Sequence, residues 1–136
     1  MTKQVYLTLP PYRRGYHLIT NIINDHLREL PETGLVNIFL HHTSAALTLN
    51  ENADSTVRSD FEAFLNRLIP ENDPLYRHVS EGSDDMPAHL KSSLLGQSVN
   101  IPVSSGKLAM GIWQGIYLCE FRNRGGERAL TITIVS

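Results

Sequence analysis

The last third of the chain reads as a series of short strands, and this pattern constrains the fold more than any other feature of the sequence. Strands are predicted at residues 99–103, 107–112, 115–122 and 129–135. Residues 104–106 (Ser-Ser-Gly) predict a turn, and residues 124–127 (Arg-Gly-Gly-Glu) predict a hairpin turn between the last two strands. An antiparallel sheet is therefore the expected frame of the protein.

Helices and further strands are predicted in the first two thirds of the chain. The strands are expected at residues 5–9, 35–42 and 45–51. Helices are expected at residues 17–30, between a cap at Asp54 or Ser55 and Pro70, and between Pro87 and Gly96. Residues 70–86 carry almost no periodicity, and a loop of this length is more often functional than ornamental. This order predicts one α+β domain over residues 1–136, a mostly antiparallel sheet with helices packed on it.

Composition limits the function as well as the fold. The chain has 136 residues, 41% of them hydrophobic, which is enough for one core, and its formal net charge is -2. That charge argues against nucleic-acid binding, and no apolar run approaches the roughly 20 residues of a membrane span. Cys119 is the only cysteine, so no internal disulfide can form, and we expect a cytoplasmic protein. We also expect Cys119 to lie in the core rather than to act as a nucleophile.

Three polar runs stand apart from this pattern, and we predict that they form one active site. The densest is residues 81–91, where three carboxylates, an imidazole and an ammonium crowd together, although like charges usually disperse over a surface. The second run leads from residues 41–44 to residues 50–52. The third leads from Trp113 and Gln114 to Glu120 and Arg122.

A bound metal ion is one interpretation of the histidines in and near these runs. His42, His78 and His89 come from three separate segments, which is how a Zn²⁺ site with an open position is often built. A nearby carboxylate could supply a fourth ligand or orient a ring, and the candidates are Glu51, Asp84 and Asp85. The spacing contains no compact ligand motif, so local hydrogen bonding or anion binding by the same histidines stays an alternative.

A bound phosphate is the second interpretation. Lys91 lies in the first turns of the short helix, whose amides could face a ligand, and Arg122 could clamp a phosphate oxygen. Hydroxyls and turn amides are offered by Thr43 and Ser44. These groups would neutralise the charge of a pyrophosphate leaving group. The carboxylates that could hold Mg²⁺ against it, or cap the helix instead, are Asp84 and Asp85.

The third run suggests contacts with a flat heterocycle. Trp113 could stack on a ring and Gln114 could hydrogen-bond its edge, although a lone Trp is more often a core residue. Glu120 would share a strand face with Arg122, which predicts either a buried pair or a wall of the site. The candidates for catalysis are His42, Glu51, Asp84, Asp85, His89 and Lys91, and those for substrate binding are Thr43, Ser44, Asn50, Lys91, Trp113, Gln114, Glu120 and Arg122.

Three long segments resemble the signatures of the YjbQ family. They are His-Thr-Ser-Ala-Ala-Leu-Thr-Leu-Asn-Glu-Asn-Ala-Asp (residues 42–54), Glu-Gly-Ser-Asp-Asp-Met-Pro-Ala-His-Leu-Lys-Ser-Ser-Leu-Leu-Gly (81–96) and Gly-Ile-Trp-Gln-Gly-Ile-Tyr-Leu-Cys-Glu-Phe-Arg (111–122). The resemblance covers nearly the whole chain and implies a small α+β domain that assembles as a homotrimer, with sites near subunit interfaces. Two residues depart from the family pattern: Ile112 stands where Thr is usual, and Ser55 stands where Pro often follows Asp.

The resemblance also implies a secondary thiamine-phosphate synthase activity. That reaction joins a hydroxymethylpyrimidine pyrophosphate to a thiazole phosphate and releases pyrophosphate. We therefore expect a small phosphorylated substrate, a divalent metal such as Zn²⁺ or Mg²⁺, and no organic cofactor. Two alternatives stay open: a metal-dependent hydrolase of a phosphorylated substrate, and a trimeric metabolite-binding module without catalysis.

Overall fold

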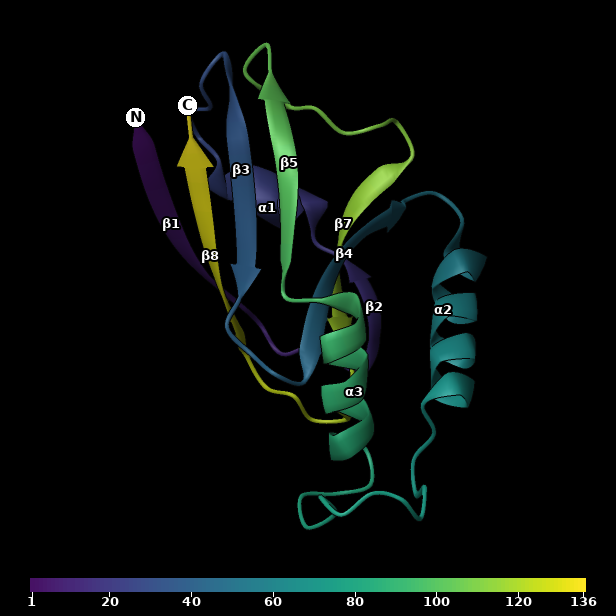
Figure 1. Cartoon of the computed structure of the whole chain (residues 1–136). Helices are drawn as coiled ribbons and strands as arrows, with labels where there is room; N and C mark the ends of the chain where they lie inside the picture. Colours follow the sequence, from purple (N-terminus) through teal and green to yellow (C-terminus); the bar gives the residue numbers. More distant parts are fainter.

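Two antiparallel sheets form the frame of the structure, a computed structural model that describes all residues from Met1 to Ser136 (Figure 1). The larger sheet has the strand order β1 (Thr2–Leu9), β8 (Arg128–Val135), β3 (Thr33–Leu40), β5 (Ser98–Ser104) and β6 (Lys107–Leu108). The smaller sheet has the order β2 (Gly15–Leu18), β7 (Gln114–Glu120) and β4 (Ala45–Glu51). The helices are α1 (Thr20–His26), α2 (Ser55–Leu68) and α3 (Asp85–Leu95). The predicted α+β class, with helices on mostly antiparallel sheet, is confirmed.

The main hydrophobic core lies between the two sheets. Side chains alternate along β3 and β5, so that Val36, Ile38, Ile101 and Val103 point inward and are almost fully buried. Helix α1 closes one end of this core with Ile23. Burial of these branched side chains fixes the register of the strands, because a slip by one residue would turn all of them to the solvent.

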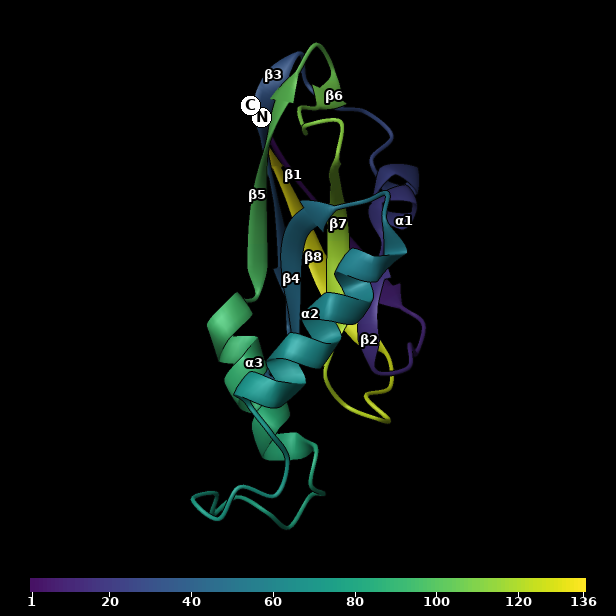
Figure 2. The same ribbon diagram turned by 90° about the vertical axis from the view of Figure 1, so that its right-hand side faces the viewer.

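A second, smaller apolar cluster packs on the other face of the smaller sheet. Tyr117 and Cys119 of β7 lie on this side, where Phe61 of α2 and Ala88 of α3 pack in the same cluster. Figure 2 shows α2 crossing in front of the smaller sheet, with α3 beside it. Cys119 is fully buried, as predicted, and burial raises the pKa of its thiol far above the ordinary value. None of the three helices combines the length and the apolar composition that crossing a membrane requires.

The helix predicted at residues 17–30 is wrong at both ends. His17 and Leu18 belong to β2, where they pair with Leu118 and Tyr117 of β7, and α1 covers only Thr20–His26. The apolar spacing is compatible with a helix, but pairing with β7 satisfies the backbone of β2 first. Three strands end earlier than the sequence predicts: β3 ends at Leu40 instead of residue 42, β6 at Leu108 instead of residue 112, and β7 at Glu120 instead of residue 122. The strand predicted at residues 45–51 has its predicted limits.

The hairpin predicted at residues 124–127 is wrong because the strands on either side of it belong to different sheets. This segment instead crosses from β7 in the smaller sheet to β8 in the larger one. Gly125 approaches the carboxylate of Glu120 so closely that a Cβ atom at this position would overlap its oxygens. Glycine is therefore needed here to admit a buried acid and not to form a tight turn.

Helix α2 has the predicted limits, but the rest of the chain covers it only weakly. The Asp54 carboxylate caps it by accepting a hydrogen bond from the Thr56 amide at 2.9 Å, and the helix ends at Leu68, shortly before Pro70. No residue of α2 is fully buried, and Phe64 and Leu68 are 71% and 63% exposed. Two of the five large apolar side chains of the helix, those of Phe64 and Leu68, are thus left uncovered by the single chain, whereas Val57, Phe61 and Leu65 are partly buried.

Candidate functional site

Asp85, the first residue of α3, is the centre of the candidate site. Its Oδ2 atom lies 2.7 Å from His78 Nε2 and 3.1 Å from His89 Nε2, and its Oδ1 atom accepts a hydrogen bond from Arg122. Burial acts to raise the pKa of Asp85, but the hydrogen bond from His78 and the electrostatic effects of His89 and Arg122 outweigh it, so the pKa lies below its ordinary value. Asp85 is therefore ionised at neutral pH although it is only 2% exposed.

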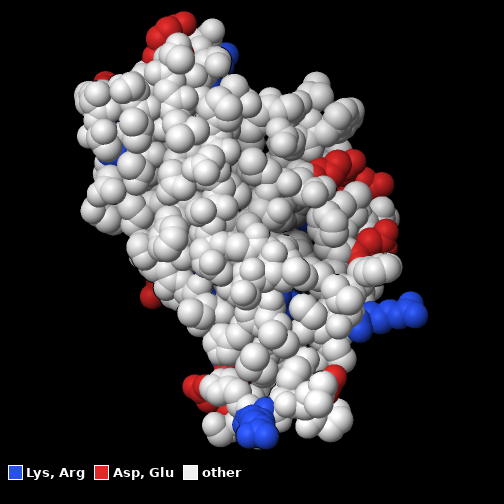
Figure 3. Space-filling view, in the orientation of Figure 1, with Lys and Arg blue, Asp and Glu red and all other residues white.

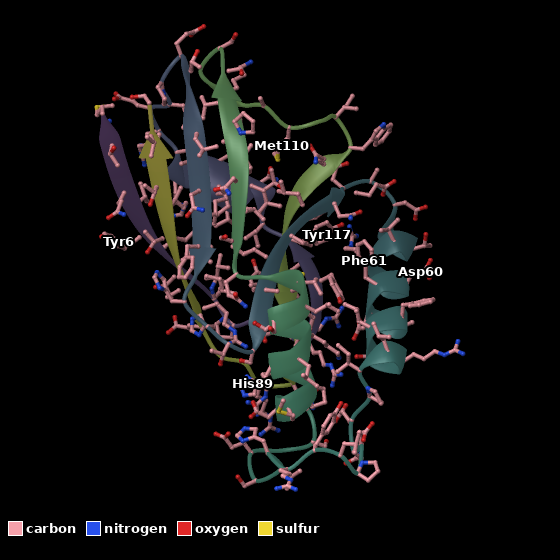
Figure 4. The ribbon with its side chains drawn as sticks, in the orientation of Figure 1. Tyr6, Asp60, Phe61, His89, Met110 and Tyr117 are labelled. Atoms are coloured by element: carbon pink, nitrogen blue, oxygen red, sulfur yellow. The ribbon has the colours of Figure 1, made fainter.

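Separate segments bring these side chains together. Helix α3 begins two residues before Pro87, so Asp85 and His89 lie one turn apart on the same helix face. His78 comes from the long loop of residues 69–84, and Figure 4 shows His89 on α3 on the side of that loop. The long loop thus carries one residue of the candidate site, His78.

Polar contacts hold this long loop in place. The Glu71 carboxylate accepts hydrogen bonds from Arg14 at 3.0 Å and from the Ser83 hydroxyl at 2.5 Å. Farther along, the Arg122 side chain donates to the Glu81 carbonyl at 3.0 Å. The apolar side chains of the loop take little part, because Leu75 and Val79 are 85% and 64% exposed. The position of His78 therefore depends on hydrogen bonds rather than on burial of apolar surface.

The protonation of His89 can be assigned from its two neighbours. Its Nδ1 atom lies 2.8 Å from the Thr43 carbonyl oxygen, which can only accept, so Nδ1 carries the proton. In the neutral ring Nε2 then holds a lone pair, and this lone pair faces the Asp85 Oδ2 atom at 3.1 Å. Two acceptors repel at this distance unless a second proton or a cation lies between them.

The same geometry suits a divalent cation. One ligand atom each from His78, Asp85 and His89 lies within 4.8 Å of the other two. Glu81 does not belong to this group, but its Oε2 atom lies 2.8 Å from His78 Nε2, so its carboxylate is next to the site. Two imidazoles with one or two carboxylates form a ligand set typical of Zn²⁺, and the Thr43 carbonyl is the kind of partner that orients a metal-binding imidazole.

Arg122 positions the two aspartates and is not free to clamp a ligand. Its Nε atom donates to Asp84 Oδ2 at 2.9 Å, and its two other nitrogens donate to Asp85 and to the Glu81 carbonyl. Asp84 also accepts from the Asn123 amide at 2.9 Å and makes no capping bond to α3. The predicted cap at this pair is therefore absent, and Arg122 pairs with Asp84 and Asp85 instead of with Glu120.

The predicted partner of Arg122, Glu120, lies in a different ion pair. Arg128 Nε and Nη2 donate to the two carboxylate oxygens of Glu120 at 2.7 and 2.5 Å. Glu120 is 0% and Arg128 4% exposed, so Glu120 is closed to a substrate and forms no wall of an open site. Arg128 is not among the residues predicted from the sequence. It could have been found from the rule that an acid on a buried strand needs a cationic partner.

Lys91 is also separated from the Asp85 cluster. Its side chain points towards α2, where Nζ donates to Asn66 Oδ1 at 2.6 Å and lies 5.7 Å from the centre of the Phe121 ring. Lys91 is 2% exposed, and no carboxylate lies within ion-pair distance of it. Burial, with a smaller effect from the nearby charge of Arg14, lowers the pKa of Lys91 to about 8. The predicted contact of Lys91 with a phosphate would require this ammonium to become accessible.

A cavity of about 510 Å³ lies beside His89 and is lined largely by polar residues. His42 and Thr43 line it from the end of β3, and Ser92, Ser93 and Gln97 line it from α3 and the residues after it. The predicted cluster of three histidines does not form, because His42 does not join the group of His78, Asp85 and His89.

His42 has its own hydrogen bond and stays neutral. Its Nε2 atom accepts from the Ala129 amide at 2.8 Å, so the ring proton lies on Nδ1. Burial, and then the charge of Arg128, lower the pKa of His42. Next to it, the carbonyl of the nearly buried Ser44 lies 3.4 Å from Arg128 Nη2, so Ser44 belongs to the structure around the buried ion pair.

The remaining candidates lie at the far end of the smaller sheet. Ala45 pairs with Glu120 at one end of the β4–β7 ladder, and Glu51 pairs with Gln114 at the other. Strands of this length separate the two ends by roughly 20 Å. Trp113 is 62% exposed there, neither in the core nor near the histidines, and Ile112, Asn50 and Gln114 lie at the same end. Within one chain, therefore, the three polar runs do not converge on one site.

Comparison with known proteins gives one consistent family. A family model described as UPF0047 protein YjbQ-like matches residues 5–136. The UPF0047 protein YjbQ of Salmonella typhimurium is 51% identical over 136 residues, which cover 98% of each chain. The UPF0047 protein YugU of Bacillus subtilis is 43% identical over 96 residues, which cover 68% of this chain and 70% of that protein.

Solved structures share the fold. A conserved hypothetical protein from Thermus thermophilus is 36% identical, with a TM-score of 0.82 over 94% of this chain and 97% of its own. A YbjQ-like protein of unknown function from Sulfolobus solfataricus has a TM-score of 0.87 over 100% of this chain and 98% of its own, at 24% identity. The second likeness, at that identity, concerns the fold alone.

Proposed function

This chain belongs to the YjbQ-like UPF0047 family, and we propose that it is an enzyme that uses a divalent cation to act on a small phosphorylated or pyrophosphorylated molecule. The observation that carries the proposal is the convergence of His78 Nε2, Asp85 Oδ2 and His89 Nε2, one ligand atom from each residue lying within 4.8 Å of the other two. A divalent cation bound by all three atoms would take the place of the protons that otherwise join the two imidazoles to the carboxylate. The cavity beside His89 gives a substrate room next to this site.

The residues around the site favour Zn²⁺ over Mg²⁺, because Mg²⁺ prefers oxygen ligands and water. When bound, the ion would supply the positive charge that stabilises a phosphate or pyrophosphate group as its negative charge develops. The chain itself contributes orientation: the Thr43 carbonyl holds the proton of His89 on Nδ1, and Arg122 holds Asp85 through the second carboxylate oxygen.

The reaction that we propose is the one implied by the family resemblance, the synthesis of thiamine phosphate. A C–N bond forms between the thiazole nitrogen and the methylene carbon of the pyrimidine, the C–O bond to pyrophosphate breaks, and pyrophosphate leaves. In this reaction negative charge develops on the pyrophosphate leaving group, and a cation at the site would neutralise the oxygens that carry it. Hydrolysis of a phosphorylated metabolite at the same site is the alternative outcome of the assay.

Asp85→Asn is expected to weaken Zn²⁺ binding by at least about tenfold, because the loss of a partner that only orients a metal ligand already has that effect. Calorimetric titration of chelator-treated protein with ZnCl₂ measures the affinity, and chromatography measures thiamine phosphate formed from the two substrates. Product formation should fall together with the affinity.

Asp60→Asn is the matched control, since Asp60 is exposed on α2, away from the site (Figure 4). The proposal is wrong if the wild-type chain binds none of Zn²⁺, Mn²⁺ and Mg²⁺. It is equally wrong if product forms at the same rate in chelator and in the Asp85 variant. Phosphate release without thiamine phosphate would favour the hydrolase.

We also propose that the chain assembles as a homotrimer through the outer face of the larger sheet. Figure 3 shows this face almost free of charged side chains. Two of its residues, Phe39 and His41, also line the cavity, so a neighbouring copy on this face would lie close to the site. The number three comes from the family resemblance. The outward-facing residues that support the interface include Gln4, Tyr6, Thr8, Leu35, Phe39, Asn100, Pro102, Thr131, Thr133 and Val135.

Tyr6→Glu is expected to shift the protein from trimer to monomer. Tyr6 is 74% exposed in the single chain, so the substitution should not disturb folding, whereas an unpaired carboxylate inside an interface must lose its water. Size-exclusion chromatography with light scattering gives the mass. Leu75→Glu is the control, because Leu75 is 85% exposed on the long loop. A wild-type protein that stays monomeric at all concentrations contradicts this assignment.

A further inference from the structure

We infer that the space between α2 and the smaller sheet is a second binding site, which takes a small, neutral, mostly aromatic molecule. This cavity has a volume of about 340 Å³, within the range of pockets that hold small ligands. It shares no lining residue with the cavity beside His89, and it opens near the C-terminal end of α3, whereas Asp85 lies at the other end of that helix. The inference is thus independent of the proposed metal site.

The walls of this cavity are apolar and mainly aromatic. Phe61, Phe64 and Leu65 of α2 form one side, and Leu95 closes the end next to α3. Figure 4 shows Phe61 on the side of α2 that faces the sheet, near Tyr117. The cavity is partly open to solvent, so an apolar ligand that binds there would remove these side chains from water. Phe64 is 71% exposed at the rim, so a ligand that enters would also cover apolar surface that now faces water.

Two side chains of β4 give the cavity a polar edge. Asn50 Oδ1 accepts a hydrogen bond from the Glu51 amide at 2.8 Å, which leaves the amide NH₂ of Asn50 without a partner. The Thr48 hydroxyl also lines the cavity. No charged residue does, and a charged ligand would therefore lose its water without compensation. These features select a neutral molecule that carries a hydrogen-bond acceptor.

Tyr16 adds an independent observation. It lines the cavity with its ring 5.6 Å from the ring of Phe61, an arrangement that a third aromatic ring can extend. Its hydroxyl is the one buried side-chain polar atom of the chain without a hydrogen-bond partner. Such groups are rare in folded proteins. Because this hydroxyl is shielded from solvent, the aromatic ring is the part of Tyr16 that a ligand in the cavity would contact.

Titration with quinoline, a neutral two-ring molecule with one acceptor nitrogen, tests the inference. The full chain is used without added metal, and amide and methyl NMR shifts are followed. Shifts should concentrate at Tyr16, Thr48, Leu65 and Leu95, and quinoline-2-carboxylate should bind at least tenfold more weakly. Thr48→Leu, which fills part of the cavity, should weaken quinoline binding at least tenfold as well. Ser80→Leu, which also replaces a hydroxyl by an apolar side chain, lies at an exposed position of the long loop; it is the matched control and should have no effect.

Three results would overturn the inference. The first is a set of quinoline shifts scattered over the surface. The second is equal quinoline binding by the Thr48 and Ser80 variants; if Thr48→Leu does not fold, Leu95→Phe takes its place. The third is a shift of the cavity resonances with protein concentration alone, which would show that a second copy of the chain fills the space. None of these results bears on Zn²⁺ binding at Asp85, so failure here is distinguishable from failure of the proposed function.

Discussion

Glu120→Gln is expected to lower the free energy of unfolding by about 3–5 kcal/mol, the usual effect of removing one partner from a buried ion pair. Arg128 is 4% exposed and has Glu120 as its only carboxylate partner, so the substitution leaves a buried guanidinium without a counter-charge. The amide also places an NH₂ group against a donor. Urea denaturation at neutral pH, followed by circular dichroism, measures the change.

Glu127→Gln serves as the control, because Glu127 is exposed in the same crossing segment and should change stability by less than about 0.5 kcal/mol. The double variant Glu120→Met, Arg128→Met should lie closer to wild type than either single variant, since apolar groups of similar volume need no counter-charge. Two single losses that simply add in the double variant would contradict the ion-pair interpretation.

Lys91→Met is expected to stabilise the protein by about 3 kcal/mol at pH 7, which corresponds to a pKa displaced from 10.5 to about 8. The folded chain holds a buried ammonium near Arg14, and methionine of similar length removes both the desolvation and the repulsion. No acceptor is left unpaired, because Asn66 Oδ1 still accepts from Arg14 at 2.9 Å. Buried groups with strongly shifted pKa values cluster at functional sites, which makes Lys91 a candidate functional residue.

The stability difference between wild type and the Lys91 variant depends on pH, and the lowered pKa of Lys91 determines the direction of that dependence. Since the folded pKa of Lys91 lies below the unfolded one, the unfolded chain binds more protons between pH 8 and 10.5, and wild-type stability gains on the variant as the pH rises through that window. The difference between the two proteins should be full at pH 7 and vanish above pH 10.5. Lys107→Met, at an exposed lysine of β6, should show no such convergence. A constant difference from pH 7 to 10.5 would rule out the lowered pKa.

The sequence predicts an element correctly when residues nearby in the chain determine its limits and its buried face. The limits of α2 follow from the Asp54 cap and Pro70, and the alternation of Val99, Ile101 and Val103 follows from a one-sided core. Elements that depend on distant partners were misread. Residues 17–18 have a helical apolar spacing, but they form a strand because they pair with β7. The glycines at 125–126 suggest a turn, but Gly125 is required because a larger residue would overlap the Glu120 carboxylate.

The site divides in the same way. The spacing of Asp85 and His89 on one helix face is local, so the sequence alone predicts that these two side chains lie close together. The pairing of each carboxylate with its arginine depends on contacts between distant parts of the chain and cannot be predicted from sequence spacing. Arg122 follows β7 of the smaller sheet and pairs with the aspartates, whereas Arg128 begins β8 of the larger sheet and pairs with Glu120. The segment that crosses between the two sheets separates the two arginines. Separation of Trp113 from the histidines follows from the length of the β4–β7 ladder.

The long loop that carries His78 is fastened by hydrogen bonds while its large apolar side chains stay in water. Such a segment can swing open by exchanging those bonds for water, with the core between the sheets untouched, so its opening free energy is a small fraction of the global one. If the group of His78, Asp85 and His89 binds an ion as proposed, the opening of this loop would set the rate at which that ion enters or leaves. Exchange of bound ions would be fast in a protein whose overall unfolding is slow.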